Sequence, residues 1–83
     1  MNPDFELSSH ALDMLKERKI LEEWLWETLN NPDWTSIEED KNMHYFKGIS
    51  AYNNRVLHVV VNQDIFPKII VTVFFDRRMR KQI

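Results

Sequence analysis

Two apolar stretches in the C-terminal half of the chain decide its fold: Val56-Leu57-His58-Val59-Val60-Val61-Asn62 and Ile69-Ile70-Val71-Thr72-Val73-Phe74-Phe75-Asp76. β-Branched and aromatic residues dominate both stretches, as is typical of strands. Because the apolar residues are consecutive rather than alternating, we expect both strands to be central and covered, at least in part, on both faces.

Two more strands are expected upstream of this pair. Residues 34–37 suggest a short strand, and residues 42–51 are rich in β-forming and aromatic residues. Tyr52-Asn53-Asn54-Arg55 is typical of a hairpin turn, because asparagine tolerates the positive φ angles of a type I′ turn. Residues 63–67 then form the loop between the last two strands.

The first third of the chain has helical spacing. Ser8 and Ser9 are candidate N-caps for a helix from about residue 9 to residue 18. Apolar residues at helical spacing in residues 21–29 form one stripe, and Pro32 ends that helix. Neither Gly nor Pro separates the helices, so we expect a tight helical hairpin.

These elements predict one α+β domain over residues 1–83, with an N-terminal helical hairpin packed on a four-stranded antiparallel sheet. Residues 77–83 are expected to form a basic C-terminal tail. The chain has no Cys and one Gly, which excludes disulfides, thiolate metal sites and glycine-rich nucleotide loops. Its apolar runs are too short to span a bilayer, and its N-terminus does not resemble a signal peptide, so we expect a soluble cytoplasmic protein.

Opposite charges are concentrated in the two halves of the chain. Residues 1–40 contain eleven acidic and three basic residues, a net charge of −8, whereas residues 41–83 contain eight basic and two acidic residues, a net charge of +6. A basic half is an electrostatic footprint for phosphates, and an acidic half argues against wrapping nucleic acid on all sides. The alternative is that the two halves simply attract each other in the fold.

Three histidines are candidates for chemistry: His10, His44 and His58. No pair has the spacing of a helical zinc site, so we expect neither a metal nor a cofactor. His10 lies in the first turn of a helix, whose dipole favours the neutral ring that suits a general base, although a surface cap residue is an equal alternative. His58 lies within an apolar strand, which is typical of a core histidine, and we leave it out of the site.

Basic and aromatic residues suggest contacts to RNA. Arg55 follows the tight turn and residues 77–81 follow the last strand; arginine forks fit phosphate oxygens, although a solvated tail is the alternative. Tyr45, Phe46 and Tyr52 could stack bases or could pack the sheet. Another aromatic residue, Trp26 between Glu23 and Glu27, marks either a protein contact or a partly buried edge.

Several short motifs follow one another along the chain: Ser8-Ser9-His10-Ala11, Leu15-Lys16-Glu17-Arg18, Glu22-Glu23, Leu29-Asn30-Asn31-Pro32, Asn54-Arg55-Val56-Leu57-His58-Val59-Val60-Val61 and Ile70-Val71-Thr72-Val73-Phe74-Phe75-Asp76-Arg77-Arg78. In this order the motifs resemble a small bacterial family of domains of unknown function that is placed beside BrnT- and RelE/ParE-type toxins. In place of that family's glycine and helix-capping residue this chain has Lys19 and Leu21.

The resemblance implies a RelE-like fold and a toxin endoribonuclease that cleaves RNA without a metal. A ribose 2′-hydroxyl would attack its own 3′-phosphate, which requires a base, an acid and positive charge. His10 and Arg18 match the family's histidine and arginine, Arg55 and Arg77 match the arginines that flank the core strands, and His44 lies where we expect the second acid/base group. The predicted catalytic residues are therefore His10, Arg18, His44, Arg55 and Arg77, and the predicted RNA-backbone contacts are Arg78, Arg80 and Lys81.

RNA and an antitoxin protein are the partners that this function implies, with a homodimer as a further candidate and with no DNA expected for this chain alone. The alternative is a non-catalytic interaction module of the same fold, whose acidic helix face and Trp26 bind a basic partner.

Overall fold

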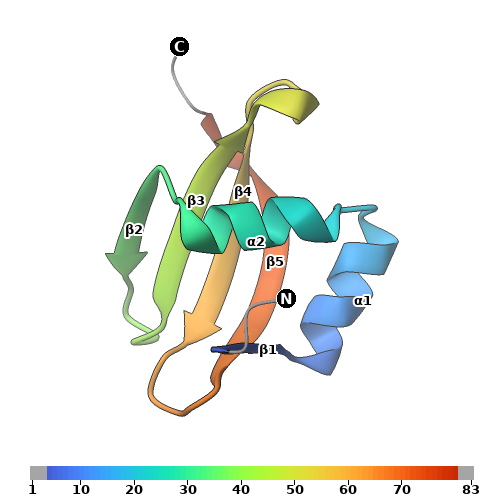
Figure 1. The fold of residues 1–83 in the computed structure, drawn as a ribbon. Coiled ribbons are helices and arrows are strands. Elements are labelled where there is room, and N and C mark those ends of the chain that lie inside the picture. Colours follow the sequence, from blue (N-terminus) through green and yellow to red (C-terminus); the bar gives the residue numbers. More distant parts are fainter. Residues whose placement is uncertain (1–3, 81–83) are drawn as a thin grey trace.

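The computed structural model describes residues 4–80, with residue 80 described by its backbone alone. Within this range the chain forms two α-helices and one five-stranded sheet with the strand order β1-β5-β4-β3-β2 (Figure 1). The elements in chain order are β1 (Phe5–Leu7), α1 (Ser9–Glu17), α2 (Glu22–Asn30), β2 (Trp34–Ile37), β3 (Met43–Ile49), the 3₁₀ turn η1 (Ser50–Tyr52), β4 (Arg55–Asn62) and β5 (Lys68–Arg80).

The expected four-stranded antiparallel sheet with an N-terminal helical hairpin is wrong. A first strand, β1, precedes the helices and pairs in parallel with β5, with Phe5 opposite Lys68, while the other strand pairs are antiparallel. The helices therefore lie between strands in the chain. They do not form a hairpin either, because α1 packs against β5 and β1 whereas α2 packs against β4 and β3.

Several local predictions are confirmed. The side chain of Ser8 caps α1 by accepting a hydrogen bond from the amide of Ala11 at 3.0 Å. Helix α2 ends at Asn30, two residues before Pro32. Asn53 and Asn54 have φ angles of 56° and 57°, as the predicted turn before β4 requires.

Strand β5 is longer than the sequence suggested. It continues through Asp76 to Arg80, so residues 77–80 are part of the sheet rather than of a tail. Its pairing with β4 shifts register between Arg55 and Val56, which places Arg55 opposite Arg80. Residues 81–83 of the predicted tail lie outside the described range.

The hydrophobic core lies between the helices and one face of the sheet. Alternate residues of β4 (Leu57, Val59 and Val61) point into this core and are fully buried. Leu25 of α2 and Val73 of β5 are also fully buried there. Neither described helix is long and apolar enough to cross a membrane.

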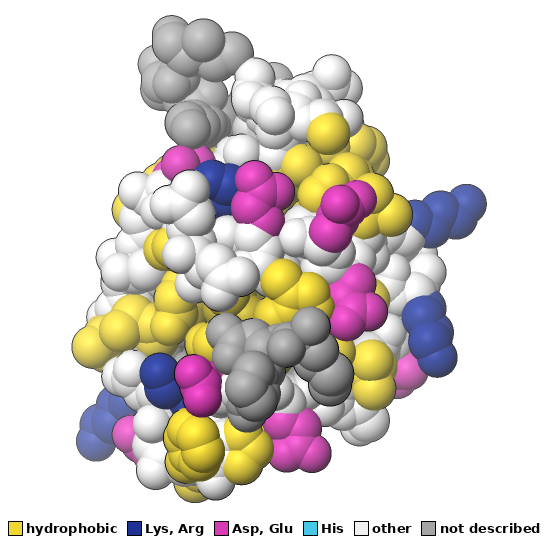
Figure 2. Space-filling view, viewed as in Figure 1, with side chains coloured by type: hydrophobic (Ala, Val, Ile, Leu, Met, Phe, Trp, Pro, Cys, Tyr) yellow, Lys and Arg dark blue, Asp and Glu magenta, His cyan; other side chains and the backbone are white. Residues whose placement is uncertain are grey.

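The other face of the sheet, here called the far face, carries a row of four rings across four strands. Trp34, Phe46, His58 and Phe74 are cross-strand neighbours, and successive ring centroids are 5.1, 4.2 and 4.7 Å apart. Figure 2 shows the helix side, where acidic side chains are prominent and none of the described histidines is visible. The far face therefore differs in chemistry from the face that the helices cover.

Candidate arginine groove and histidine network

Three of the predicted arginines line one cavity. Arg18 caps the C-terminus of α1, Arg55 begins β4, and Arg77 lies in the second half of β5. The cavity, which we call the arginine groove, has a volume of about 860 Å³. Its other lining residues are Met14, Tyr52, Phe74, Phe75 and Asp76.

The arginine groove is electropositive because its one acidic lining residue is already paired. Among the residues that line it, Asp76 is buried, and its carboxylate accepts hydrogen bonds from the backbone and the guanidinium of Arg78 at 3.0 and 3.3 Å. Burial acts to raise the pKa of Asp76, but the hydrogen bonds from Arg78 and His58 outweigh it, and the pKa lies below its ordinary value. The guanidinium of Arg55 lies 4.9 Å from the centroid of the Tyr52 ring, where it faces the π system.

A chain of hydrogen bonds connects the arginine groove to the opposite end of the far face. His58 Nδ1 lies 3.2 Å from Asp76 Oδ2, and His58 Nε2 lies 2.7 Å from His44 Nδ1. His44 Nε2 in turn lies 3.2 Å from both carboxylate oxygens of Asp40. Both imidazoles are buried, with 8% of His44 and 7% of His58 exposed. We call these four side chains the histidine network.

The electrostatics of His58 reflect its burial. Desolvation lowers the pKa of His58 below its ordinary value, and the hydrogen bond to Asp76 opposes that shift without cancelling it. His58 therefore favours its neutral form, in which Nδ1 donates to Asp76 and Nε2 accepts from His44.

The two predicted catalytic histidines do not join the arginines. His44 belongs to the histidine network on the far face, and His10 is exposed, with its Nε2 3.1 Å from the hydroxyl of Thr72. Neither of them lines the arginine groove. Of the five predicted catalytic residues, the three arginines thus share one groove, whereas the two histidines lie away from it.

The predicted RNA-backbone contacts fall into three cases. Arg78 is held by Asp76, although 82% of its side chain is exposed. Arg80 lies in β5, and its side chain is outside the description. Lys81 lies outside the described residues.

The candidate aromatic contacts are divided between packing and the groove. Phe46 is buried in the ring row, and Tyr45 packs against the core, so both serve the sheet. Tyr52 is 40% exposed and lines the arginine groove. Trp26 donates to Glu22 at 3.0 Å and packs against the core, as its partly buried alternative predicted.

Sequence reasoning missed His58 and Asp76. Successive side chains of a strand point to opposite faces of the sheet. His58 therefore shares a face with the residues two positions away and not with its immediate apolar neighbours. Asp76 and Arg78 show the same spacing of two on β5. The alternation of residues with a period of two was therefore visible in the sequence. The pairing of β4 with β5, which brings His58 next to Asp76, was not visible there.

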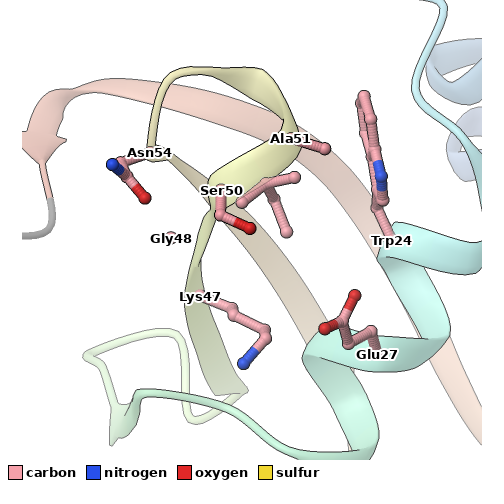
Figure 3. A pocket seen from close by; sticks show the side chains of 8 residues that line it. Trp24, Glu27, Lys47, Gly48, Ser50, Ala51 and Asn54 are labelled. Atoms are coloured by element: carbon pink, nitrogen blue, oxygen red, sulfur yellow. The ribbon is translucent and has the colours of Figure 1, made fainter.

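A second, smaller cavity of about 210 Å³ lies between α2 and the end of β3. Glu27 and Lys47 lie across it from each other, and Trp24 stands at its side (Figure 3). The ammonium of Lys47 donates to the carbonyl of Asn31 at 3.0 Å, so it is already engaged. Ligand sites are usually larger than about 300 Å³, so we assign no ligand here.

Among residues 4–80, no group of three or more His, Asp or Glu side chains is arranged to hold a metal ion. Comparison with known proteins gave one family: the model described as Domain of unknown function (DUF4258) matches residues 7–75. Searches of curated proteins and of solved structures returned no match.

Proposed function

The chain belongs to the DUF4258 family, and from the geometry of its own residues we propose that it binds single-stranded RNA in the arginine groove. The observation that carries this proposal is the convergence of Arg18, Arg55 and Arg77, from three separate elements, on one cavity. This proposed function develops the expectation of RNA binding, and the three arginines support the choice of site.

Guanidinium groups favour a phosphate ligand. Each one presents donors in a planar fork that matches phosphate oxygens, and each stays charged at any physiological pH. A groove of about 860 Å³ is within the range of cavities that hold drug-sized ligands, which a nucleotide resembles in size. Because the carboxylate of Asp76 is already paired with Arg78, it offers little repulsion to a bound phosphate.

Aromatic side chains in the same groove favour an unpaired strand. Tyr52, Phe74 and Phe75 line it beside the arginines, and unpaired bases stack on such rings whereas the bases of a duplex are already stacked. The acidic side chains of α2, Glu22, Glu23 and Glu27, are exposed on the helix side and would repel the RNA backbone. A single strand confined to one side of the molecule fits this distribution.

The proposal covers binding and not cleavage. Cleavage without a metal needs a base and an acid within hydrogen-bond reach of the reacting groups. No imidazole is among the residues that line the arginine groove. RNA cleavage, which the resemblance to toxins implies, is therefore a separate outcome of the experiment below.

Fluorescence anisotropy of a labelled 12-nucleotide single-stranded RNA tests the proposal. We expect Arg55→Ala and Arg77→Ala each to weaken binding about tenfold, and a matched duplex to bind more weakly than the single strand. Lys68→Ala is the matched control, since it removes one positive charge about 30 Å away along β5. Equal losses in all three variants, or no binding by the wild type, would contradict the proposal.

Two further measurements distinguish RNA binding from two other functions of the groove. If polyglutamate of similar length binds more tightly than RNA, the groove serves an acidic protein segment instead. If the RNA is cut, and if His44→Ala or His10→Ala abolishes the cutting, the catalytic expectation is restored despite the positions of these histidines.

A further inference from the structure

The histidine network contains three consecutive hydrogen-bond contacts with an acid at each end. From one end to the other they join Asp40 to His44 Nε2, His44 Nδ1 to His58 Nε2, and His58 Nδ1 to Asp76. All four nitrogens of the two rings are engaged. The central nitrogen–nitrogen distance of 2.7 Å is short for such a contact, which requires a hydrogen between the atoms.

The number of hydrogens in this chain follows from the partners. Asp40 and Asp76 both have pKa values below the ordinary value for aspartate, so each is an ionised acceptor without a hydrogen to give. Each of the three contacts therefore needs its hydrogen from a ring nitrogen. Two neutral imidazoles carry only two such hydrogens.

We propose that His44 and His58 form a binding site for one additional proton, which resides on His44 in the folded protein. His58 Nδ1 donates to Asp76, so His58 Nε2 must accept the hydrogen of His44 Nδ1. His44 Nε2 then needs a second hydrogen to donate to Asp40. His44 is thereby an imidazolium, and His58 is neutral.

The charges that face the pair support one extra proton. Asp40 contributes a negative charge from the turn between β2 and β3, and β5 contributes the negative Asp76 and the positive Arg78. Opposite His44, β2 presents Ser36, whose hydroxyl donates to the carboxylate of Glu38 at 2.7 Å. The three carboxylates outnumber the one guanidinium, so a positive charge on the imidazole pair is favoured.

The release of this proton has a defined structural consequence. One of the three contacts must then lose its hydrogen. The Asp40 contact is the least costly to lose, because 46% of the Asp40 side chain is exposed and water can replace His44 there. The two contacts of His58 are buried, so the loss of either one would leave polar groups unpaired in the protein interior. The additional proton thus fastens the turn at residues 38–42 to the sheet.

Ring-nitrogen NMR of the full, uniformly ¹⁵N-labelled chain tests the assignment directly, through a pH titration from 5 to 9. At pH 6 we expect both nitrogens of His44 to be protonated, with His58 in its Nδ1-protonated neutral form. As the pH rises, His44 alone should change, and its Nε2 should lose the hydrogen. If both rings are neutral at pH 6, or if His58 carries the extra proton, the proposal is overturned.

The Asp40→Asn variant gives a second readout. Its new side-chain amide can donate to a neutral His44, so the additional proton is no longer needed. Wherever the folded protein retains the additional proton and the unfolded chain does not, the unfolding equilibrium constant of the wild type should rise with pH by up to tenfold per unit. In Asp40→Asn it should stay flat.

Glu39→Gln is the control, because it removes a negative charge from the same turn and should behave as the wild type does. Equal pH dependence of the wild type and Asp40→Asn would contradict the proposal. These experiments contain no RNA, so their result is independent of the binding function proposed above.

Discussion

The amide of Ile20 donates to the carbonyl of Leu15 at 2.9 Å, with Lys19 between them in the left-handed region at φ 53°. Together with the contact from the Lys19 amide to the carbonyl of Lys16 at 3.3 Å, this is the pairing of a Schellman motif, and it closes the C-terminus of α1. The motif usually has glycine at the left-handed position, because a Cβ atom is crowded there. The chain thus makes this turn with lysine in place of the residue that favours it.

Replacing Lys19 with glycine should therefore stabilise the protein. We expect Lys19→Gly to raise the free energy of unfolding by about 0.5–1 kcal/mol, because it relieves the left-handed strain. Urea denaturation followed by circular dichroism measures the change. Lys19→Ala is the control, since it removes the same charge and keeps the Cβ; an equal gain from both variants would attribute the effect to charge.

The start of α2 offers a second stabilising change. Leu21 occupies its N-cap position with an extended backbone, makes no side-chain cap bond and is 47% exposed. Leu21→Ser should raise the free energy of unfolding by about 1 kcal/mol, because its hydroxyl can accept from a free amide of the first turn. Thermal denaturation beside Leu21→Ala checks this, and a Leu21→Ser melting temperature no higher than that of Leu21→Ala would be contrary evidence.

Asp76 makes the stability of the fold dependent on acid. Its pKa in the folded protein is below 3.8, so its contribution is complete above that pH and is lost as the pH falls through the lower, folded value. Asp76→Asn should cost about 2 kcal/mol at pH 7, because it weakens hydrogen bonds to a charged group. In urea titrations between pH 7 and pH 2.5 the difference should shrink with acid, whereas the control Asp64→Asn should follow the wild type.

The ring row on the far face should be sensitive to the loss of its buried member. Phe46 is 3% exposed, and it stacks on Trp34 and contacts His58. We expect Phe46→Ala to lower the free energy of unfolding by about 3–5 kcal/mol and Phe46→Leu by much less, because leucine fills most of the cavity. Chemical denaturation of both variants compares them, and similar small losses would show that the row contributes little packing.

Salt dependence can count the phosphates held in the arginine groove. For a single strand, the logarithm of the binding constant falls with the logarithm of salt concentration by about 0.7 for each phosphate contacted. Arg77→Ala should reduce that slope by about 0.7, and Lys68→Ala should leave it unchanged. Anisotropy titrations between 50 and 200 mM salt measure the slope, and an unchanged slope in Arg77→Ala would remove that residue from the phosphate contacts.

Local signals in the sequence predicted most elements of the fold but not its topology. The Ser8 cap, the Asn53-Asn54 turn and the two core strands were all visible, because each depends on neighbouring residues. Strand β1 was missed because its three residues are too few to show a period, and its partner Lys68 is about sixty residues away.

The sequence predicted the site residues only where the type of residue alone indicated a function. Arginines that suit phosphate were identified, and three of them share a groove. The basic residues after Asp76 suggested a solvated tail, because Arg and Lys are almost never fully buried. The sequence did not show that Asp76 itself is buried. Its burial depends on Arg78 and on His58 of the neighbouring strand, and such cross-strand pairing cannot be found without the register.

The parallel pairing of β1 with β5 also constrains when the protein can fold. Of the strands that the structure describes, the one synthesised first pairs with the one synthesised last, and helix α1 packs on β5 as well. A nascent chain that has not yet released residues 68–76 from the ribosome therefore exposes the apolar side of α1. Contacts of such long sequence separation slow folding, so the edge formed by β1 and α1 is expected to assemble only after β5 has left the ribosome.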